Sequence, residues 1–205
     1  MKLGFVHIAK SGGNTIEKLI RSRYAKWFLH PSFGHKQKNI DYPYSFAIVR
    51  EPVDRFLSSY FYWKNGAINS EWSFKKQFVR KAKTIDEFMY YWDQNDDEFM
   101  SQLDTEITKP QWHFSPQKSW LIDSANDRTI ILKYSNDIDV QFSKLLKLLG
   151  LPKLEVVKKI NVTSNKNEDY DREAVSKWVE RVFHEDVLLW NNIVNDTNNY
   201  LKVIE

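Results

Sequence analysis

Short apolar runs alternate along the chain with longer segments whose apolar residues recur at helical spacing. The compact runs predict β-strands, and the periodic segments predict amphipathic helices. Three strands are expected at 3–8, 45–49 and 129–134, with a fourth at 156–162. A helix is expected after each of the first three runs, and a last one over 172–194.

Individual residues mark where these helices begin and end. Asn14 or Thr15 can cap the first helix, because their side chains accept hydrogen bonds from free backbone N–H groups. Pro52 suits the first position of the second helix, where its missing N–H is not needed. Gly150 marks the end of the third helix, since glycine readily follows a helix in the left-handed conformation. The segment 67–127 is predicted to be helix-rich.

Strands that alternate with helices predict an α/β fold with a mainly parallel sheet. In such sheets, ligands bind beyond the carboxyl ends of the strands. The loops that follow Ile8 and Val49 both lie at such ends. They are therefore the first places to look for chemistry.

Composition removes several classes of protein. The chain has 205 residues, which suits one domain, and it has no cysteine, so a disulfide framework and a thiolate zinc site are excluded. No apolar stretch is long enough to span a membrane, and the first residues do not have the pattern of a signal peptide. We therefore expect a cytoplasmic protein.

The net charge of +3 is unevenly distributed. Residues 1–83 carry 16 lysines and arginines against 5 acidic residues, whereas residues 84–205 carry 14 against 22. A basic half favours an anionic ligand, either nucleic acid or a small polyphosphate-like molecule. The alternative is a dipolar surface with no ligand.

The loop after the first strand has the composition of an anion site. Gly12 and Gly13 let the backbone approach an anion closely, and Lys10 adds a positive charge. The loop is not a Walker A motif, in which the lysine follows the glycines. An ordinary strand-to-helix turn with a surface lysine is the alternative. The other hydrogen-bond donors of the loop are Ser11, Asn14 and Thr15.

Arg50 follows the second strand directly and precedes the helix that begins at Pro52. The planar guanidinium of arginine matches phosphate oxygens. Ser58 lies about two helical turns further on, on the same side of the helix, so the two side chains together can hold one phosphate. The alternative is that Arg50 pairs with Glu51 or Asp54 and that Ser58 is a packed small residue.

The two motifs together resemble the sulfotransferase superfamily, and most closely its carbohydrate branch, which includes heparan sulfate 2-O-sulfotransferases. Residues 49–60, Val-Arg-Glu-Pro-Val-Asp-Arg-Phe-Leu-Ser-Ser-Tyr, match the family pattern V-R-[DE]-P-x-x-R-[LF]-x-S-x-[YF]. The resemblance implies that the loop 10–15 holds the 5'-phosphosulfate of 3'-phosphoadenosine-5'-phosphosulfate (PAPS). It also implies that Arg50 and Ser58 hold the 3'-phosphate.

The resemblance further implies a three-layer α/β sandwich with a P-loop-like nucleotide-binding core. The whole chain, 1–205, would be a single domain, with a helix-rich insertion at about 67–127 on the acceptor side. Animal members of the branch carry an N-terminal membrane anchor and usually cysteines, whereas this sequence has no cysteine and no apolar stretch of membrane-spanning length. A soluble form of microbial or viral origin is therefore expected.

The resemblance points to His35 as the catalytic base. The 2-O-sulfotransferase relatives have His-Gly-His where this chain has Phe-Gly-His at 33–35. A histidine with a pKa near 6.5 can accept a proton at neutral pH. His30 and His113 are the alternatives, whereas His7 in the first strand is expected to be packed.

A weaker family pattern covers 113–121, His-Phe-Ser-Pro-Gln-Lys-Ser-Trp-Leu. It belongs to the acceptor region, so the resemblance implies that His113 and Gln117 contact the substrate.

The predicted reaction is in-line transfer of a sulfuryl group from PAPS to a hydroxyl, expected on a glycan. Lys10 would stabilise the departing bisphosphate, and neither a metal ion nor a nucleic-acid partner is expected. Three alternatives stay open: a P-loop-type nucleotide-dependent kinase, a nucleic-acid-binding protein without activity, and a catalytically degenerate nucleotide-binding protein. The missing first histidine keeps the last one open.

Overall fold

The computed structural model describes residues 3–29, 44–64, 82–103, 110–121, 128–152, 169–195 and 202–204. The chain forms two compact units, the first from 1–51, 116–162 and 185–205, and the second from 52–115 and 163–184. The described strands all belong to the first unit. The expected single domain with a helix-rich insertion stays a prediction.

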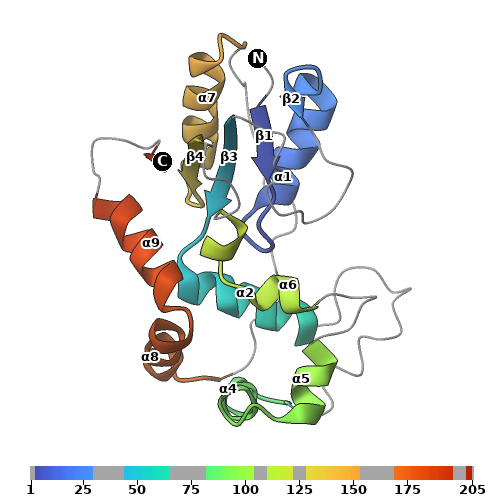
Figure 1. The fold of residues 1–205 in the computed structure, drawn as a ribbon, viewed down its shortest axis with the longest axis vertical. Helices are drawn as coiled ribbons and strands as arrows, with labels where there is room; N and C mark the ends of the chain where they lie inside the picture. The colour runs from blue at the N-terminus through green and yellow to red at the C-terminus, as the bar shows by residue number, and fades with distance from the viewer. Residues whose placement is uncertain are drawn as a thin grey trace. The chain divides into compact units, whose positions relative to one another are not determined.

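The first unit is built on a mainly parallel sheet with the strand order β2-β1-β3-β4-β5 (Figure 1). Among the described strands, β5 alone runs antiparallel, and it pairs with β4. The three expected strands are confirmed, whereas β2 and β5 were not predicted, because two or three residues carry too little of an apolar pattern. The strand expected at 156–162 lies outside the described residues. The strands are β1 (Leu3–Val6), β2 (Phe28–Leu29), β3 (Tyr44–Val49), β4 (Arg128–Lys133) and β5 (Lys202–Ile204).

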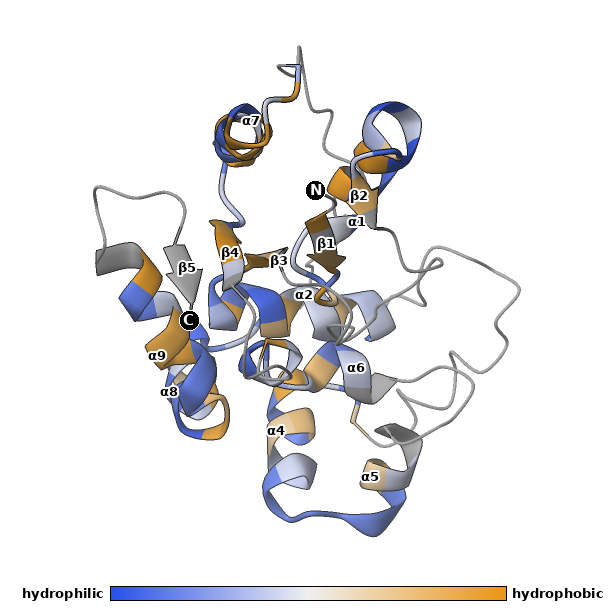
Figure 2. Cartoon of the chain, turned by 45° about the horizontal axis from the view of Figure 1, so that its top comes forward, coloured by the Kyte–Doolittle hydropathy of each residue, from blue (hydrophilic) through white to orange (hydrophobic). Residues whose placement is uncertain are grey.

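Apolar side chains on one face of this sheet form the core of the first unit. The helical elements of the unit are α1 (Gly13–Leu19), the π-helical turn η1 (Ile20–Tyr24), the 3₁₀ turn η2 (Lys118–Trp120), α7 (Ile138–Leu148) and α9 (His184–Asn195). Phe5 stacks on Phe46 of the next strand, with ring centroids 4.7 Å apart, and Phe46 lies 5.9 Å from Phe142 of α7. Ile16 of α1 joins the same cluster. Figure 2 shows the matching pattern on α7, which is hydrophobic along one side and hydrophilic along the other. Burial of this apolar surface holds α1 and α7 on the sheet.

The second unit is a group of helices around an aromatic core. Its helices are α2 (Pro52–Lys64), α4 (Ile85–Asp93), α5 (Asp97–Leu103), α6 (Pro110–Phe114) and α8 (Arg172–Val182). Phe56 of α2 lies 5.5 Å from Phe88 and 5.1 Å from Trp178, measured between ring centroids. Many of the abundant aromatic residues therefore serve packing rather than ligand binding. No described helix of either unit is long and apolar enough to cross a membrane.

The start of α1 differs from the expectation. The helix begins at Gly13 and its capping position is Gly12, which has a φ of 81°. The prediction of Asn14 or Thr15 as the cap was therefore wrong. The physical reason is that glycine adopts this left-handed conformation without a steric penalty, so the chain can turn into the helix earlier.

The expected helix over 172–194 is divided into α8 and α9 at Phe183, whose φ and ψ are −113° and 38°. Its ring is buried in the aromatic core, 5.9 Å from Trp178. Apolar spacing continues across this position, so periodicity alone predicted one helix. The boundaries expected at Pro52 and Gly150 are confirmed, and Gly150 has a φ of 66°.

Candidate active site

The loops after β1 and β3 leave the sheet at the same edge, because these two strands are parallel neighbours. Lys10 lies in the first loop, and Arg50 directly follows β3. Nη1 of Arg50 donates a hydrogen bond to the main-chain carbonyl of Lys10 at 3.2 Å. The structure thus brings together the two cations that the sequence singled out.

The environment of Lys10 changes its proton affinity. The pKa of Lys10 is lowered to about 8, mainly by burial and also by the positive charge of Arg50. The positive charges of Lys10 and Arg50 repel each other, and a bound anion would relieve the repulsion. The pair is therefore suited to a ligand with several negative charges.

Tyr134 connects the glycine loop with Arg50. It follows β4 directly, and the guanidinium carbon of Arg50 lies over its ring, 4.8 Å from the centroid. A Cβ atom on Gly12 would lie 2.3 Å from Cε2 of the same ring. Tyr134 belongs to no sequence motif of the predicted site, although its position at the carboxyl end of a third parallel strand was the signal that could have selected it.

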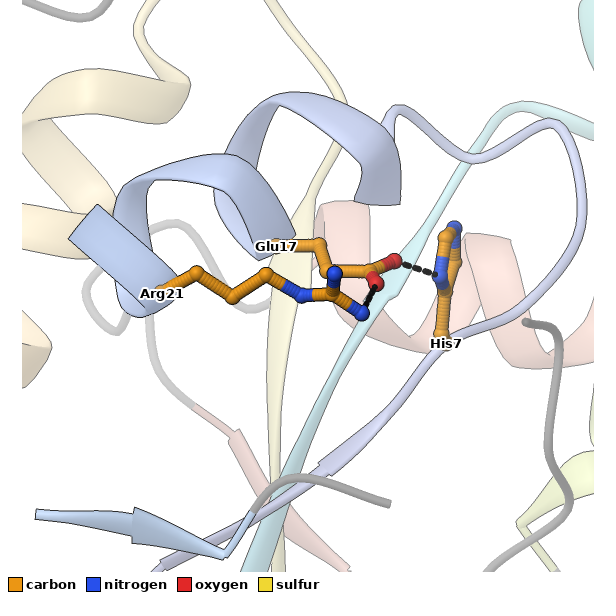
Figure 3. A network of polar contacts seen from close by, with 3 residues as sticks. All are labelled: His7, Glu17 and Arg21. Carbon is orange, nitrogen blue, oxygen red and sulfur yellow. Dashed lines mark hydrogen bonds and ion pairs between the residues drawn. The ribbon is translucent and has the colours of Figure 1, made fainter. Parts of the chain in front are cut away.

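A buried network lies against the other glycine of the loop. A Cβ atom on Gly13 would lie 2.2 Å from Cδ2 of His7. Nδ1 of His7 is 2.9 Å from Oε2 of Glu17, and Oε1 of Glu17 pairs with Arg21 at 2.5 Å (Figure 3). His7 is buried, as expected. Its pairing with α1 fixes the position of the ring on which the loop packs.

Substitution of Gly12 by alanine is expected to cost more stability than the same change at Gly150. Both glycines have a positive φ, but a Cβ atom on Gly150 would have no neighbour within 4 Å. Gly150→Ala is expected to cost about 1 kcal/mol of unfolding free energy for the strained backbone alone. Gly12→Ala is expected to cost about 2–4 kcal/mol, because the methyl group also collides with Tyr134. Urea unfolding of the two variants measures the difference, and equal losses would show that Tyr134 does not confine the loop.

The other predicted residues of the loop have different environments. The hydroxyl of Ser11 is buried and donates to Oε1 of Gln117 at 3.1 Å. Asn14 is exposed and Thr15 is partly exposed on the first turn of α1. Gln117 is also buried, and its contacts are with the loop and with the end of β3.

Two further predicted residues lie in the second unit. Ser58 is buried on α2. His113 is also buried, and its Nδ1 accepts the indole N–H of Trp63 at 2.8 Å. Because an indole nitrogen only donates, Nδ1 of His113 carries no proton, and the proton of the neutral ring is on Nε2. Such a ring has no basic nitrogen to offer, so this arrangement favours a structural role. A substrate contact of His113 stays a prediction.

His35 and His30 lie outside the described residues. The assignment of His35 as the base therefore stays a prediction.

A basic glycine loop at the carboxyl edge of a parallel α/β sheet is typical of proteins that bind nucleotide phosphates. The family model described as "Sulfotransferase family" matches residues 2–195. The chain therefore belongs to the sulfotransferase family, and it is a PAPS-dependent transferase, as expected. Neither the search of curated proteins nor that of solved structures gives a significant match.

Proposed function

We propose that this sulfotransferase transfers the sulfuryl group of PAPS to a hydroxyl group on a carbohydrate. The observation that supports PAPS as the donor is the contact between Arg50 and Lys10 at the ends of two neighbouring parallel strands. The carbohydrate acceptor is supported by the resemblance of 33–35 and 49–60 to the branch that includes heparan sulfate 2-O-sulfotransferases. We also propose the three-layer, P-loop-like sandwich of that superfamily for the fold.

The residues present at this edge fit the donor. PAPS carries negative charge at both ends of its ribose, and the loop 10–15 and Arg50 supply positive charge from two adjacent strand ends. In our proposal the loop holds the 5'-phosphosulfate, through Lys10 and backbone N–H groups. Arg50 and Ser58 hold the 3'-phosphate, for which a guanidinium is well shaped.

The transfer forms a bond between the acceptor oxygen and sulfur. It breaks the bond between sulfur and the oxygen that bridges to the 5'-phosphate, and adenosine 3',5'-bisphosphate leaves. The proton of the acceptor hydroxyl passes to a base, for which we propose His35. Negative charge grows on the bridging oxygen, and the ammonium of Lys10 stabilises it there.

Binding of adenosine 3',5'-bisphosphate tests the donor side directly. Calorimetry without magnesium is expected to show that the bisphosphate binds at least about tenfold more tightly than ATP, since ATP has no 3'-phosphate for Arg50.

Arg50→Ala is expected to weaken bisphosphate binding by about 1.5–3 kcal/mol. Arg172→Ala is the matched control, because Arg172 is an exposed arginine of the second unit that pairs with Asp54. The affinity of this variant for the bisphosphate is expected to stay unchanged.

Equal affinity for the two nucleotides, or a magnesium-dependent preference for ATP, would contradict the proposal and favour the kinase. Loss of cooperative unfolding in Arg50→Ala, with unchanged affinity of the folded fraction, would make Arg50 a structural residue.

A further inference from the structure

We propose that Gln117 is a positioning residue of the donor site, which fixes the glycine loop to the strand end that carries Arg50. The effect of Gln117 on donor binding rests on the proposed function, whereas its effect on the geometry of the loop does not. Gln117 is buried, with 1% of the residue exposed, and the contacts of its amide group support the proposal.

The Gln117 amide pairs with the main chain of Arg50 at both of its ends. Oε1 accepts the backbone N–H of Arg50 at 2.9 Å, and Nε2 donates to the backbone carbonyl of Arg50 at 2.8 Å. A backbone N–H only donates and a carbonyl only accepts, so the orientation of the amide is fixed by its partners. The side chain thus continues the hydrogen bonding of the sheet one residue beyond the end of β3.

The same oxygen holds the loop. The hydroxyl of Ser11 donates to Oε1 of Gln117 at 3.1 Å, and Ser11 directly follows Lys10. One carbonyl oxygen therefore accepts from the loop and from the strand end, two segments that are far apart in the sequence. The separation of Lys10 from Arg50 is set through this amide as well as through their direct contact.

The position of Gln117 is itself fixed from α9. Asp186 is buried, and its two carboxylate oxygens accept the backbone N–H groups of Gln117 and Lys118 at 2.8 and 2.9 Å. This carboxylate anchors the start of η2, so the amide of Gln117 is presented from a fixed backbone. Displacement of a binding group by about 1 Å can reduce an enzyme's rate by about a hundredfold, so this anchoring matters for the site.

Gln141 provides a matched comparison within the chain. Its Oε1 accepts the backbone N–H of Lys133 at 2.7 Å, and its Nε2 donates to the carbonyl of Lys133 at 3.1 Å. The amide clamps the end of β4 as Gln117 clamps the end of β3. Its other hydrogen bonds go to Ser135 and Asp137, which lie in its own segment. Gln141 therefore has the clamp, and its side-chain hydrogen bonds do not go to the glycine loop.

The experiment compares Gln117→Met with Gln141→Met in the full chain. Amide hydrogen exchange without ligand is expected to become about tenfold faster at 9–15 and at residues 50 and 51 in Gln117→Met, because the hydrogen bonds that local opening would have to break are missing. Gln141→Met is expected to change exchange only near 133–141. Affinity for adenosine 3',5'-bisphosphate is expected to fall about tenfold in Gln117→Met and to stay unchanged in Gln141→Met. This affinity is the measurement that a purely structural contact would not change.

Unchanged exchange at 9–15 in Gln117→Met would overturn the proposal, and so would faster exchange throughout the sheet in both variants. Exchange at 9–15 could become faster in Gln117→Met while the unaltered protein does not bind the bisphosphate. This result would support the positioning role of Gln117 and contradict the proposed donor site. If Gln117→Met does not fold, Ser11→Ala removes only the link to the loop. It is expected to speed exchange at 9–15 and not at residues 50 and 51, and unchanged exchange at 9–15 would again overturn the proposal.

Discussion

Replacement of Lys10 by methionine is expected to reduce turnover of PAPS by about a hundredfold to a thousandfold. The ammonium group is proposed to stabilise the charge that grows on the bridging oxygen, and methionine keeps the length of the side chain without the charge. The fold should tolerate the change, because it removes a partly buried cation next to Arg50. The rate of bisphosphate release, with an acceptor or by slow hydrolysis of PAPS, measures the effect.

The pH dependence of donor binding gives an independent test of Lys10. Its pKa of about 8 in the free protein means that the side chain is charged below this pH and loses its charge above it. A bound anion favours the charged form and raises the pKa again. Affinity for the bisphosphate is therefore expected to fall above pH 8, by at most about tenfold per pH unit.

Lys10→Arg is the control for this pH dependence, since a guanidinium stays charged throughout the range. Its affinity is expected to be constant between pH 7 and about pH 9.5, whereas that of Lys10→Met should be weak and also constant. Constant affinity of the unaltered protein over the same range would show that Lys10 does not contact the donor.

Replacement of His35 by alanine is expected to lower turnover by about 10²–10⁴-fold, which is the usual effect of losing a positioned base. Donor affinity should change little, because the phosphates are proposed to be held by the loop 10–15 and by Arg50. The rate of the unaltered enzyme should rise with pH through a pKa near 6.5, and this rise should be absent in His35→Ala. Steady-state rates across pH 5–9 with a sugar acceptor measure both effects.

His113→Ala is the matched control for His35. Its Nδ1 already accepts the N–H of Trp63, so the substitution is expected to lower the melting temperature and to leave the rise with pH in place. Turnover near that of the unaltered enzyme in His35→Ala, with the same rise with pH, would refute the assignment. His30 would then be the next residue to replace.

Local sequence determined the secondary structure of the sheet region and the family of the protein. Apolar runs predicted β1, β3 and β4, and Pro52 and Gly150 predicted helix boundaries that the structure has. These features depend on the conformational preferences of a few neighbouring residues. The pattern at 49–60 is also contiguous, so the enzyme class could be recognised without any knowledge of the fold. The loops that carry Lys10 and Arg50 were expected at the carboxyl ends of parallel strands, and the structure has them there.

Other features were decided only by tertiary structure. The break at Phe183 depends on where its ring is buried, and the early start of α1 depends on how Gly12 packs on Tyr134. The contacts of Gln117 join segments up to 106 residues apart, and no local pattern records them. Hydrogen bonds of this kind form only once the sheet and its helices are assembled, because a buried amide must take whichever partners the packing places around it. The sequence therefore marked the charged groups of the proposed donor site, while the folded chain alone determined which side chains hold them in place.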